Sequence, residues 1–352
     1  MKYKIHAVIV ADSLSPQGER CTSFVLSYPR IIHAEMCRHR MLSRNTASSR
    51  AIPFNKMVKD VEENPFIPIA WQFNHKGMQG TEYVTEETDF GGVRARTESW
   101  LSARDRAVEQ AKDIYSMGTT KQLCNRLLEP FVWTTEIITG TEWDNFFELR
   151  CPQYVVNWYS SQKNKTEIFR SRKEVINHVE KNNLKSGWEN CRNWDDNQWL
   201  QISNSQAEIH IQKIAEMMWD AYNESKPKQL QAGEWHIPDL GHEWDDNKLY
   251  ELSNYNMGDD TLTMDKAIKE TKIKISTSHC AKISYDNFGT KIDYEADIKL
   301  HDRLMEMKHW SPFEHCARAM DLAEYVHYLG CGMEKGWCGN FKGFVQYRKM
   351  FY

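Results

Sequence analysis

Residues 38 to 50 read Arg38-His39-Arg40-Met41-Leu42-Ser43-Arg44-Asn45-Thr46-Ala47-Ser48-Ser49-Arg50. The thirteen positions hold four arginines, a histidine, an asparagine and three serines. Guanidinium groups can form paired hydrogen bonds to phosphates, and serine and asparagine add short-range donors. No helix or strand needs such a run for its own stability, so the stretch is a candidate site for an anionic, heterocyclic ligand.

A solvated basic loop is the alternative interpretation, because runs of charge usually face water. Two details favour a site. The arginines are spaced by small polar residues, and the flanks at 24–26 and 51–54 are apolar. The stretch is therefore expected to be anchored in a core.

Length and composition limit the possible classes of protein. The chain has 352 residues, enough for one large domain or two, and its 41% hydrophobic and 12% aromatic content argues against disorder. A formal net charge of −4 means that the chain has no overall excess of positive charge for binding nucleic acid, so the basic run is a local feature. A small anionic ligand fits this better than a polymer.

The cysteines and the apolar runs indicate the cellular compartment in which the protein is expected. Nine dispersed cysteines with no CxxC pair predict free thiols in a reducing compartment and argue against a zinc site or any other metal site. The first ten residues resemble a strand more than a signal peptide, and no apolar run reaches membrane-spanning length. We therefore expect a cytoplasmic protein without a membrane partner.

Periodicity predicts an α/β protein of the α+β type, with a mixed, mostly antiparallel sheet flanked by helices. Pro29 should open a short helix that leads into the basic stretch, which then continues as a loop. Strands are expected at 3–11, 22–28, within 273–285 and at 316–322, and helices at 98–118, 121–132, 142–150, 207–222 and 295–307.

Two segments interrupt the predicted core of residues 1–150 and 204–352. Residues 151–203 are rich in Lys, Asn, Gln, Glu and Trp, and read as a surface insertion with a polar helix at 171–183. Residues 239–262 read as a loop or linker.

The basic stretch resembles the signature of the flavin-dependent thymidylate synthases, the thymidylate synthase complementing proteins. The match consists of an Arg-His-Arg triplet followed by four polar residues at fixed spacing: Arg38, His39, Arg40, Ser43, Asn45, Ser48 and Arg50. This many fixed positions make a specific signal.

Further segments extend the resemblance over most of the chain. Asn125–Pro130, Asn145–Arg150 and Ser205–Ile209 are similar to family segments that follow the signature. Ser276–Tyr285 and Ser311–His315 are similar to segments that precede it in the family, so the segment order is interpreted as permuted. Gly343–Lys349 would then be a remnant of the helix that leads into the signature.

The resemblance implies a role for each matching residue. Arg38, His39, Arg40, Asn45, Asn145 and His315 would bind FAD, and Ser48, Ser49, Arg50, Arg126 and Arg150 would bind the nucleotide, with Arg150, Arg50 and Ser48 as the catalytic residues. Ser48 would act by contact and not as a covalent nucleophile, because no base stands beside it. Asn145 and Arg150 are five positions apart, about 140° around a helix. Only the long reach of the arginine, or a neighbouring subunit's site, would bring both to one site.

The implied reaction is the reductive methylation of dUMP at C5 to dTMP, with FAD as cofactor and NADPH and methylenetetrahydrofolate as co-substrates. The implied fold is that of this family, assembled as a homo-oligomer, a tetramer by resemblance, with its active sites between subunits. The sequence has no Gly-rich dinucleotide fingerprint, in agreement with that mode of FAD binding.

Two departures from the family pattern leave open which pyrimidine base the protein would modify. Thr46 stands where the family often has Glu, and Glu35 where it often has Gln. Methylation or hydroxymethylation of another pyrimidine nucleotide, such as dCMP, is therefore an alternative, and a non-catalytic nucleic-acid-binding protein is a more remote one.

Overall fold

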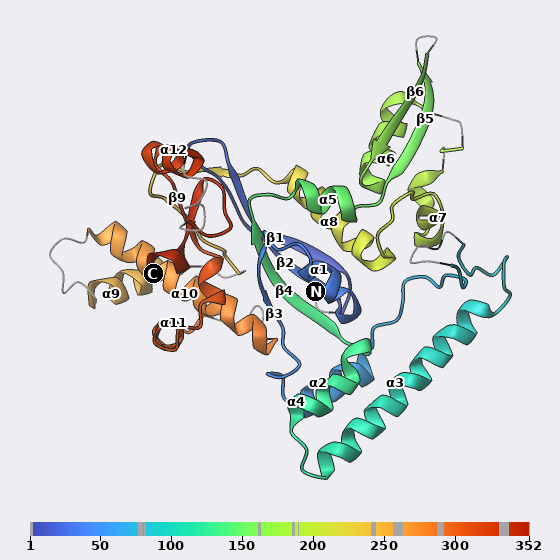
Figure 1. Ribbon diagram of the computed structural model, residues 1–352, viewed down its shortest axis with the longest axis horizontal. Helices are drawn as coiled ribbons and strands as arrows, with labels where there is room; N and C mark the ends of the chain where they lie inside the picture. Colours follow the sequence, from blue (N-terminus) through green and yellow to red (C-terminus); the bar gives the residue numbers. More distant parts are fainter. Residues whose placement is uncertain are drawn as a thin grey trace.

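The computed structural model describes residues 3–76, 80, 82–160, 163–184, 187–188, 190–240, 244–255, 263–286, 292–330 and 338–351. Its centre is a five-stranded sheet in the order β3-β4-β2-β1-β7 (Figure 1). The bounds are β1 His6–Leu14, β2 Arg20–Pro29, β3 Ser43–Thr46, β4 Trp133–Gly140 and β7 Lys228–Gln229. Only the β1–β7 pair is parallel among the pairs of this sheet. The predicted fold class is therefore confirmed: a mixed α+β fold with a mostly antiparallel sheet.

The central strand β2 is buried along almost its whole length, from Cys21 to Pro29. A strand covered on both faces lacks the alternation of apolar and polar residues, which explains the run Phe24-Val25-Leu26. The basic stretch follows this strand through the 3₁₀ helix Arg30–Ile32 and α1, His33–Cys37. The predicted short helix is confirmed, but the expected loop is wrong at Ser43–Thr46, which pairs with β4 because Asn45 and Ser43 find backbone partners and burial there.

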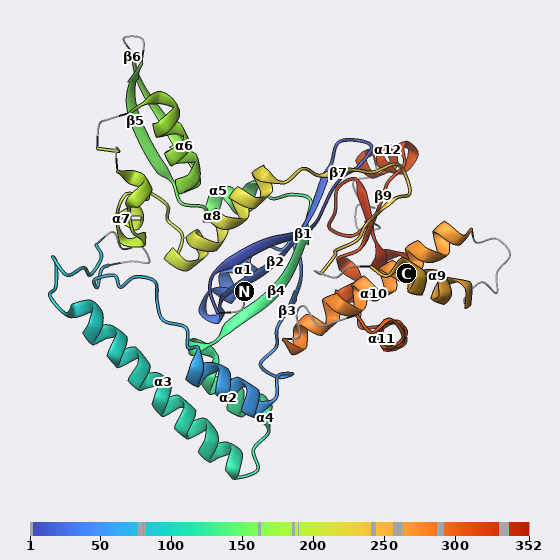
Figure 2. The same ribbon diagram turned by 180° about the vertical axis from the view of Figure 1, so that it is seen from behind.

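Helices cover both faces of the sheet (Figure 1, Figure 2). On one face, α5 (Asp144–Arg150) and α8 (Ile209–Glu224) form the largest core together with Phe24, Leu26 and Met36. On the other face, α10 (Met264–Lys282) packs Cys280 against Val25 and Ile137. The further helices beside α10 are α9, Asp246–Tyr255, and α11, Tyr294–Glu306.

A third group of helices lies at the end of the sheet where β4 begins (Figure 1). It consists of α2 Phe54–Glu63, α3 Gly92–Ser116, α4 Lys121–Cys124 and the 3₁₀ helix Asn125–Phe131. Their shared core includes Phe54, Val61, Val108 and Leu128. The helix predicted at 121–132 is α-helical only over Lys121–Cys124 and continues as a 3₁₀ segment that contains Pro130.

The segment 151–203 projects from the body as a subdomain with its own core (Figure 1). It contains the hairpin β5–β6, Tyr154–Ser160 and Lys163–Phe169, with α6, Arg172–Asn182, and α7, Asp196–Gln201. The predicted polar helix is confirmed. Its Val175 and Val179 meet Trp199 in a buried cluster, so this segment is more regular than a polar surface insertion.

The C-terminal part adds a small antiparallel sheet in the order β10-β9-β8. The bounds are β8 Trp235–His236, β9 Ala317–Ala319, β10 Phe344–Gln346 and α12 Leu322–Gly330, with 3₁₀ helices at Ser311–Glu314 and Tyr347–Phe351. The prediction of a helix remnant at 343–349 is therefore wrong, because Phe344–Gln346 pair with β9 and bury all three side chains.

Two further expectations are corrected. The strand predicted within 273–285 is helix α10: its Ile273 and Ile275 can both be buried because the helix is covered on more than one side. The predicted linker at 239–262 contains helix α9, whose Leu249 is fully buried, while residues 241–243 and 256–262 lie outside the described part. Within the described ranges, no helix has the length and apolarity needed to cross a membrane.

Candidate functional site

A cavity of about 540 Å³ lies where the basic stretch meets the end of β4. Cavities of this size are typical of sites for small molecules and cofactors. Four residues expected to bind one cofactor come together here, although they are up to 107 positions apart: the lining includes Arg38, His39, Arg40 and Asn145. The remaining lining residues are Glu19, Arg20, Met41, Leu42, Thr141, Glu142, Trp143, Asp144, Phe146, Tyr222 and Lys342.

Two short elements bring these side chains together. Helix α1 ends at Cys37, so Arg38 and Arg40 follow it as exposed residues at the cavity. Asn145 is in the first turn of α5, which begins just after β4. Neither Arg38 nor Arg40 has an ion-pair partner in the part of the chain that the structure describes, so both guanidinium groups are available to an anion.

His39 is held from two sides. The Nε of Arg150 donates a hydrogen bond to the Nε2 of His39 over 2.9 Å. The ring of Phe146 meets the imidazole edge to face at 4.9 Å between centroids. Arg150 does not line the cavity itself, but through His39 it contacts the wall that Asn145 also lines.

The electrostatics at His39 keep its imidazole neutral. Burial, together with the charges of Arg150 and Arg44, lowers the pKa of His39 to about 4. Burial and the charge of Arg38 lower the pKa of the Arg150 guanidinium, with Glu35 opposing the shift. At neutral pH the cavity wall therefore carries arginine charges but no imidazolium.

Other lining residues were not predicted from the sequence. Arg20 makes a double hydrogen bond to Asp12, at 2.9 and 2.7 Å, and its guanidinium lies 3.7 Å over the ring of Tyr222. Lys342 forms an ion pair with Glu19 at 3.0 Å. These residues come from β2, α8 and the C-terminal segment, and no local motif marks any of them.

Four of the five residues expected to bind the nucleotide, all except Arg150, lie in a second region around Glu129. Asn125 Nδ2 donates to the carbonyl of Ser49 at 2.7 Å, and the Ser49 hydroxyl donates to Glu129 Oε1 at 2.6 Å. Arg126 lies 3.7 Å from the same carboxylate. Arg50 and Arg126 are both exposed, and Ser48 is half-buried.

The cavity and the second region lie at opposite ends of β4. Gly140 ends the strand next to the cavity, whereas the amide of Ala47 donates to the carbonyl of Thr135, five positions earlier, at 2.8 Å. At about 3.4 Å per residue this is roughly 17 Å along the strand, with Ser48 to Arg50 further on. One chain therefore does not join the two predicted half-sites, and Arg150 belongs to the cavity half.

The displaced C-terminal segments lie against the basic stretch. Asn45 is buried and donates from Nδ2 to the carbonyl of Cys280 at 3.2 Å. The amide of Ser48 donates to the carbonyl of Ser284 at 2.9 Å, and Gln346 Nε2 donates to the Ser43 hydroxyl at 2.9 Å. Asn45 thus ties β3 to α10 and does not line the cavity.

His315 is fully buried and does not line the cavity either. Its Nδ1 is 2.9 Å from the Thr139 hydroxyl, in a chain that continues through Ser23 to His236. Burial and the neighbouring His236 lower the pKa of His315 to about 3. Its Nε2 has no hydrogen-bond partner among the described residues.

Thr46, the first departure from the family pattern, is turned into the sheet. Its hydroxyl donates to Glu136 Oε1 at 2.7 Å, and Tyr28 donates to Oε2 of the same buried carboxylate at 3.0 Å. Burial raises the pKa of Glu136. A carboxylate therefore stands beside position 46, but it comes from β4.

Comparisons with known proteins leave the family open. No family model matches the chain, and no curated protein does. Solved structures that resemble it include a UMP/dUMP methylase, PolB, from Streptomyces cacaoi. With 5-Br UMP bound, that structure has a TM-score of 0.39 and 15% identity, over 63% of this chain and 89% of that chain. With 5-Br dUMP bound, the values are 0.34 and 13%, over 43% and 80%. Likenesses this weak do not define a substrate, so function has to be argued from the side chains.

Proposed function

We propose that the protein is a flavin-dependent thymidylate synthase, which methylates dUMP at C5 with methylenetetrahydrofolate and NADPH. The observation that carries the proposal is the gathering of Arg38, His39, Arg40 and Asn145 around one cavity. These are four of the six residues that the sequence pattern assigns to the cofactor; Asn45 and His315 lie outside the cavity lining. They come from two separate segments of the chain, residues 38–40 and helix α5.

The donor set suits FAD. Arg38 and Arg40 offer guanidinium groups for the diphosphate, and Asn145 offers both a donor and an acceptor for a polar heterocycle. Neutral His39 adds an Nδ1–H donor, because its Nε2 accepts from Arg150. When bound, FAD would supply the redox chemistry, which protein side chains cannot perform alone. The chain's own residues would bind and orient it and set the local charge.

The second region suits a nucleotide monophosphate. Arg50 and Arg126 are exposed, and Arg126 contacts the same Glu129 carboxylate as Ser49, the neighbour of Arg50 in the chain. Ser49 is occupied by Glu129, so its hydroxyl would orient this loop and not hold the phosphate. The carboxylate of Glu129 also keeps Arg126 near the loop, at 3.7 Å.

The separation of the two half-sites supports an active site between subunits. Roughly 17 Å of β4 lies between the cavity and the Ser48–Arg50 loop within one chain, so the two regions do not form one compact pocket. A second copy that brings its Arg50 loop to this cavity would complete the site. This agrees with the homo-oligomer that the family resemblance implies.

Turnover with purified protein tests the proposal. The full chain is incubated with FAD, NADPH, methylenetetrahydrofolate and dUMP, and dTMP is measured. The absorption spectrum of the protein as isolated is recorded first, because a flavoprotein is yellow. Product from dCMP and none from dUMP would overturn the choice of base. A colourless protein that binds no FAD and turns over neither nucleotide would overturn the reaction class.

A further inference from the structure

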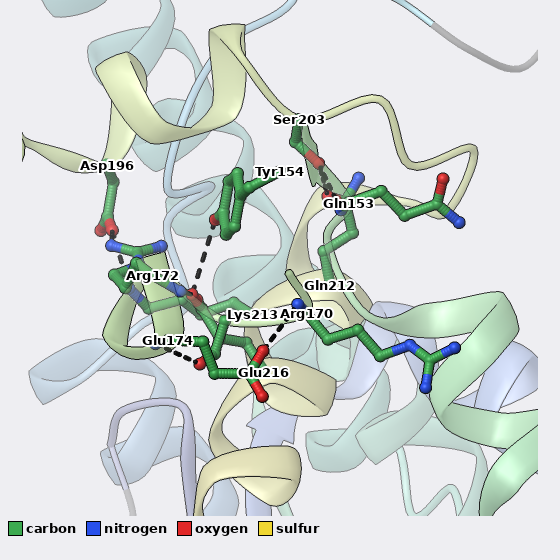
Figure 3. A network of polar contacts seen from close by, with 11 residues as sticks. Gln153, Tyr154, Arg170, Arg172, Glu174, Asp196, Ser203, Gln212, Lys213 and Glu216 are labelled. Carbon is green, nitrogen blue, oxygen red and sulfur yellow. Dashed lines mark hydrogen bonds and ion pairs between the residues drawn. The ribbon is translucent and has the colours of Figure 1, made fainter. Parts of the chain in front are cut away.

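The subdomain at 151–203 is attached to the helices that carry the cavity wall. Arg172, the first residue of α6, places its Nε 3.0 and 3.1 Å from the two carboxylate oxygens of Glu216 on α8. Its backbone amide donates to the same Glu216 at 2.7 Å. Figure 3 shows Asp196 of α7 on the far side of the guanidinium, joined to Arg172 Nη1 at 2.6 Å.

This anchor is largely buried. The Glu216 side chain is 4% exposed and that of Arg172 23%. Lys213, also on α8, adds a contact of 2.7 Å to Asp196, so two residues of α8 hold α6 and α7 of the subdomain. A charge as buried as Glu216 needs these partners, and the subdomain cannot shift on α8 without exposing or unpairing it.

A second contact connects the subdomain to α5. Arg170, at the end of the β6 hairpin strand, forms an ion pair with Glu148 of α5. Its guanidinium also lies 5.1 Å over the ring of Trp219 on α8. The indole of Trp219 packs edge to face on Phe147 of α5 at 5.1 Å between centroids. Arg170 therefore rests on α5 and α8 at the same time.

Helix α5 is only seven residues long and carries the contacts to His39 at its buried face and its last turn. Phe146 packs on the imidazole, and Arg150 donates to its Nε2. Glu148, held by Arg170, lies between these two residues. Movement of α5 away from the sheet would lengthen the contact between Arg150 and His39.

We propose that the subdomain is a positioning element of the cavity: anchored on α8 by Arg172, it holds α5 through Arg170 and so keeps Arg150 on His39. Arg170 touches no lining residue itself and is a positioning residue. The consequence for FAD rests on the function proposed above. The consequence for His39 does not.

The test measures the pKa of His39 and the affinity for FAD separately. Arg170→Gln removes the charge facing Glu148. Lys173→Gln is the matched control, because Lys173 of α6 pairs with Glu224 of α8 and so joins the subdomain to the body of the protein through α8, not α5. The histidine side chains are labelled for NMR, and the pKa of His39 is followed by titration. Its surroundings include Arg150, Arg44, Arg38 and the Phe146 ring.

We expect the His39 pKa to rise in Arg170→Gln toward the value in Arg150→Gln, and to stay at the wild-type value in Lys173→Gln. FAD affinity should fall about two- to fivefold in Arg170→Gln, the range for an exposed ion pair, and recover in Arg170→Lys. Glu148→Gln should match Arg170→Gln, and the double variant should lose no more than either one.

Wild-type values of both quantities in Arg170→Gln would overturn the inference. Equal losses in Arg170→Gln and Lys173→Gln would also overturn it, because they would indicate general destabilisation. If the wild-type chain binds no FAD but the His39 pKa still responds to Arg170, then the proposed function fails and the positioning role stands.

Discussion

The Nε of Arg150 lies 2.9 Å from the Nε2 of His39, and this contact joins helix α5 to the basic stretch at the cavity. Because the guanidinium can only donate, Nε2 must accept and the imidazole proton is on Nδ1. The sequence pattern assigned Arg150 to the pyrimidine. In this structure Arg150 also fixes the tautomer of a cavity residue, and its role toward the nucleotide stays a prediction.

Replacing Arg38 or Arg40 with Ala should weaken FAD binding about ten- to a hundredfold. A hydrogen bond to a charged group is worth roughly 1.5–3 kcal/mol, and neither arginine has another partner among the described residues that would mask its loss. Flavin fluorescence titration measures the affinity. Arg94→Ala is the control, since Arg94 pairs with Glu98 on the exposed face of α3. Full flavin occupancy in both cavity variants would contradict the site.

Arg50→Ala should act at the other end of β4. We expect the KM for the nucleotide to rise about tenfold or more, because a charge-assisted contact to phosphate is lost. FAD affinity in the resting protein should change less than twofold, because Arg50 is assigned to the nucleotide phosphate and does not line the cofactor cavity of its own chain. Steady-state kinetics measure the KM for the nucleotide, and the flavin titration measures the affinity for FAD. A parallel loss of FAD affinity would show that Arg50 also supports the cofactor cavity.

Acid should destabilise the fold through His236. Burial lowers the pKa of this residue from 6.5 to about 4. Above about pH 6.5 the imidazole is neutral in both folded and unfolded chains, and stability does not depend on it. As the pH falls from 6.5 to 4 the unfolded chain takes up a proton that the folded chain does not, so stability is lost, on the order of 3 kcal/mol for this group.

Urea unfolding at several pH values checks this expectation. His236 Nδ1 and Nε2 lie 2.9 and 2.8 Å from the hydroxyls of Ser13 and Ser23. His236→Asn keeps a polar group there and should flatten the slope between pH 6.5 and 4, even if it lowers stability at neutral pH. An unchanged slope would assign the acid sensitivity to other buried histidines, such as His315.

The sequence was sufficient for the parts of the fold that local patterns determine. The apolar run of β2, the periodicity of α3 and α8 and the proline before α1 each specify an element by themselves. Helix α10 was misread because burial on more than one side allows Ile273 and Ile275 in a helix, although their spacing of two is typical of a strand. Burial on more than one side is a tertiary property that no window of sequence contains.

The candidate site also has residues that the sequence could predict and residues that it could not. The Arg-His-Arg triplet and Asn145 could be found because the family pattern places them in order. Arg20, Tyr222 and Lys342 could not, because three separate elements bring them to the cavity. The pattern also could not tell that His315 and Asn45 are turned into the core, since side-chain direction depends on how α10 and the C-terminal sheet pack on β3.

The buried anchor of the subdomain should dominate its stability. Arg172→Met leaves the carboxylate of Glu216 buried with one fewer cation, and breaking such a pair costs about 3–5 kcal/mol. Glu216→Gln should cost less, because Arg172 keeps Asp196 and is more exposed. The double variant, Arg172→Met with Glu216→Gln, should be more stable than Arg172→Met alone, since no unpaired charge remains.

Hydrogen exchange of the backbone amides measures the loss of stability in each part of the chain. The amides of α6 and of the β5–β6 hairpin report on the subdomain, and those of α3 serve as an internal reference. Equal exchange in α6 and α3 in all three variants would mean that the anchor does not hold the subdomain in place.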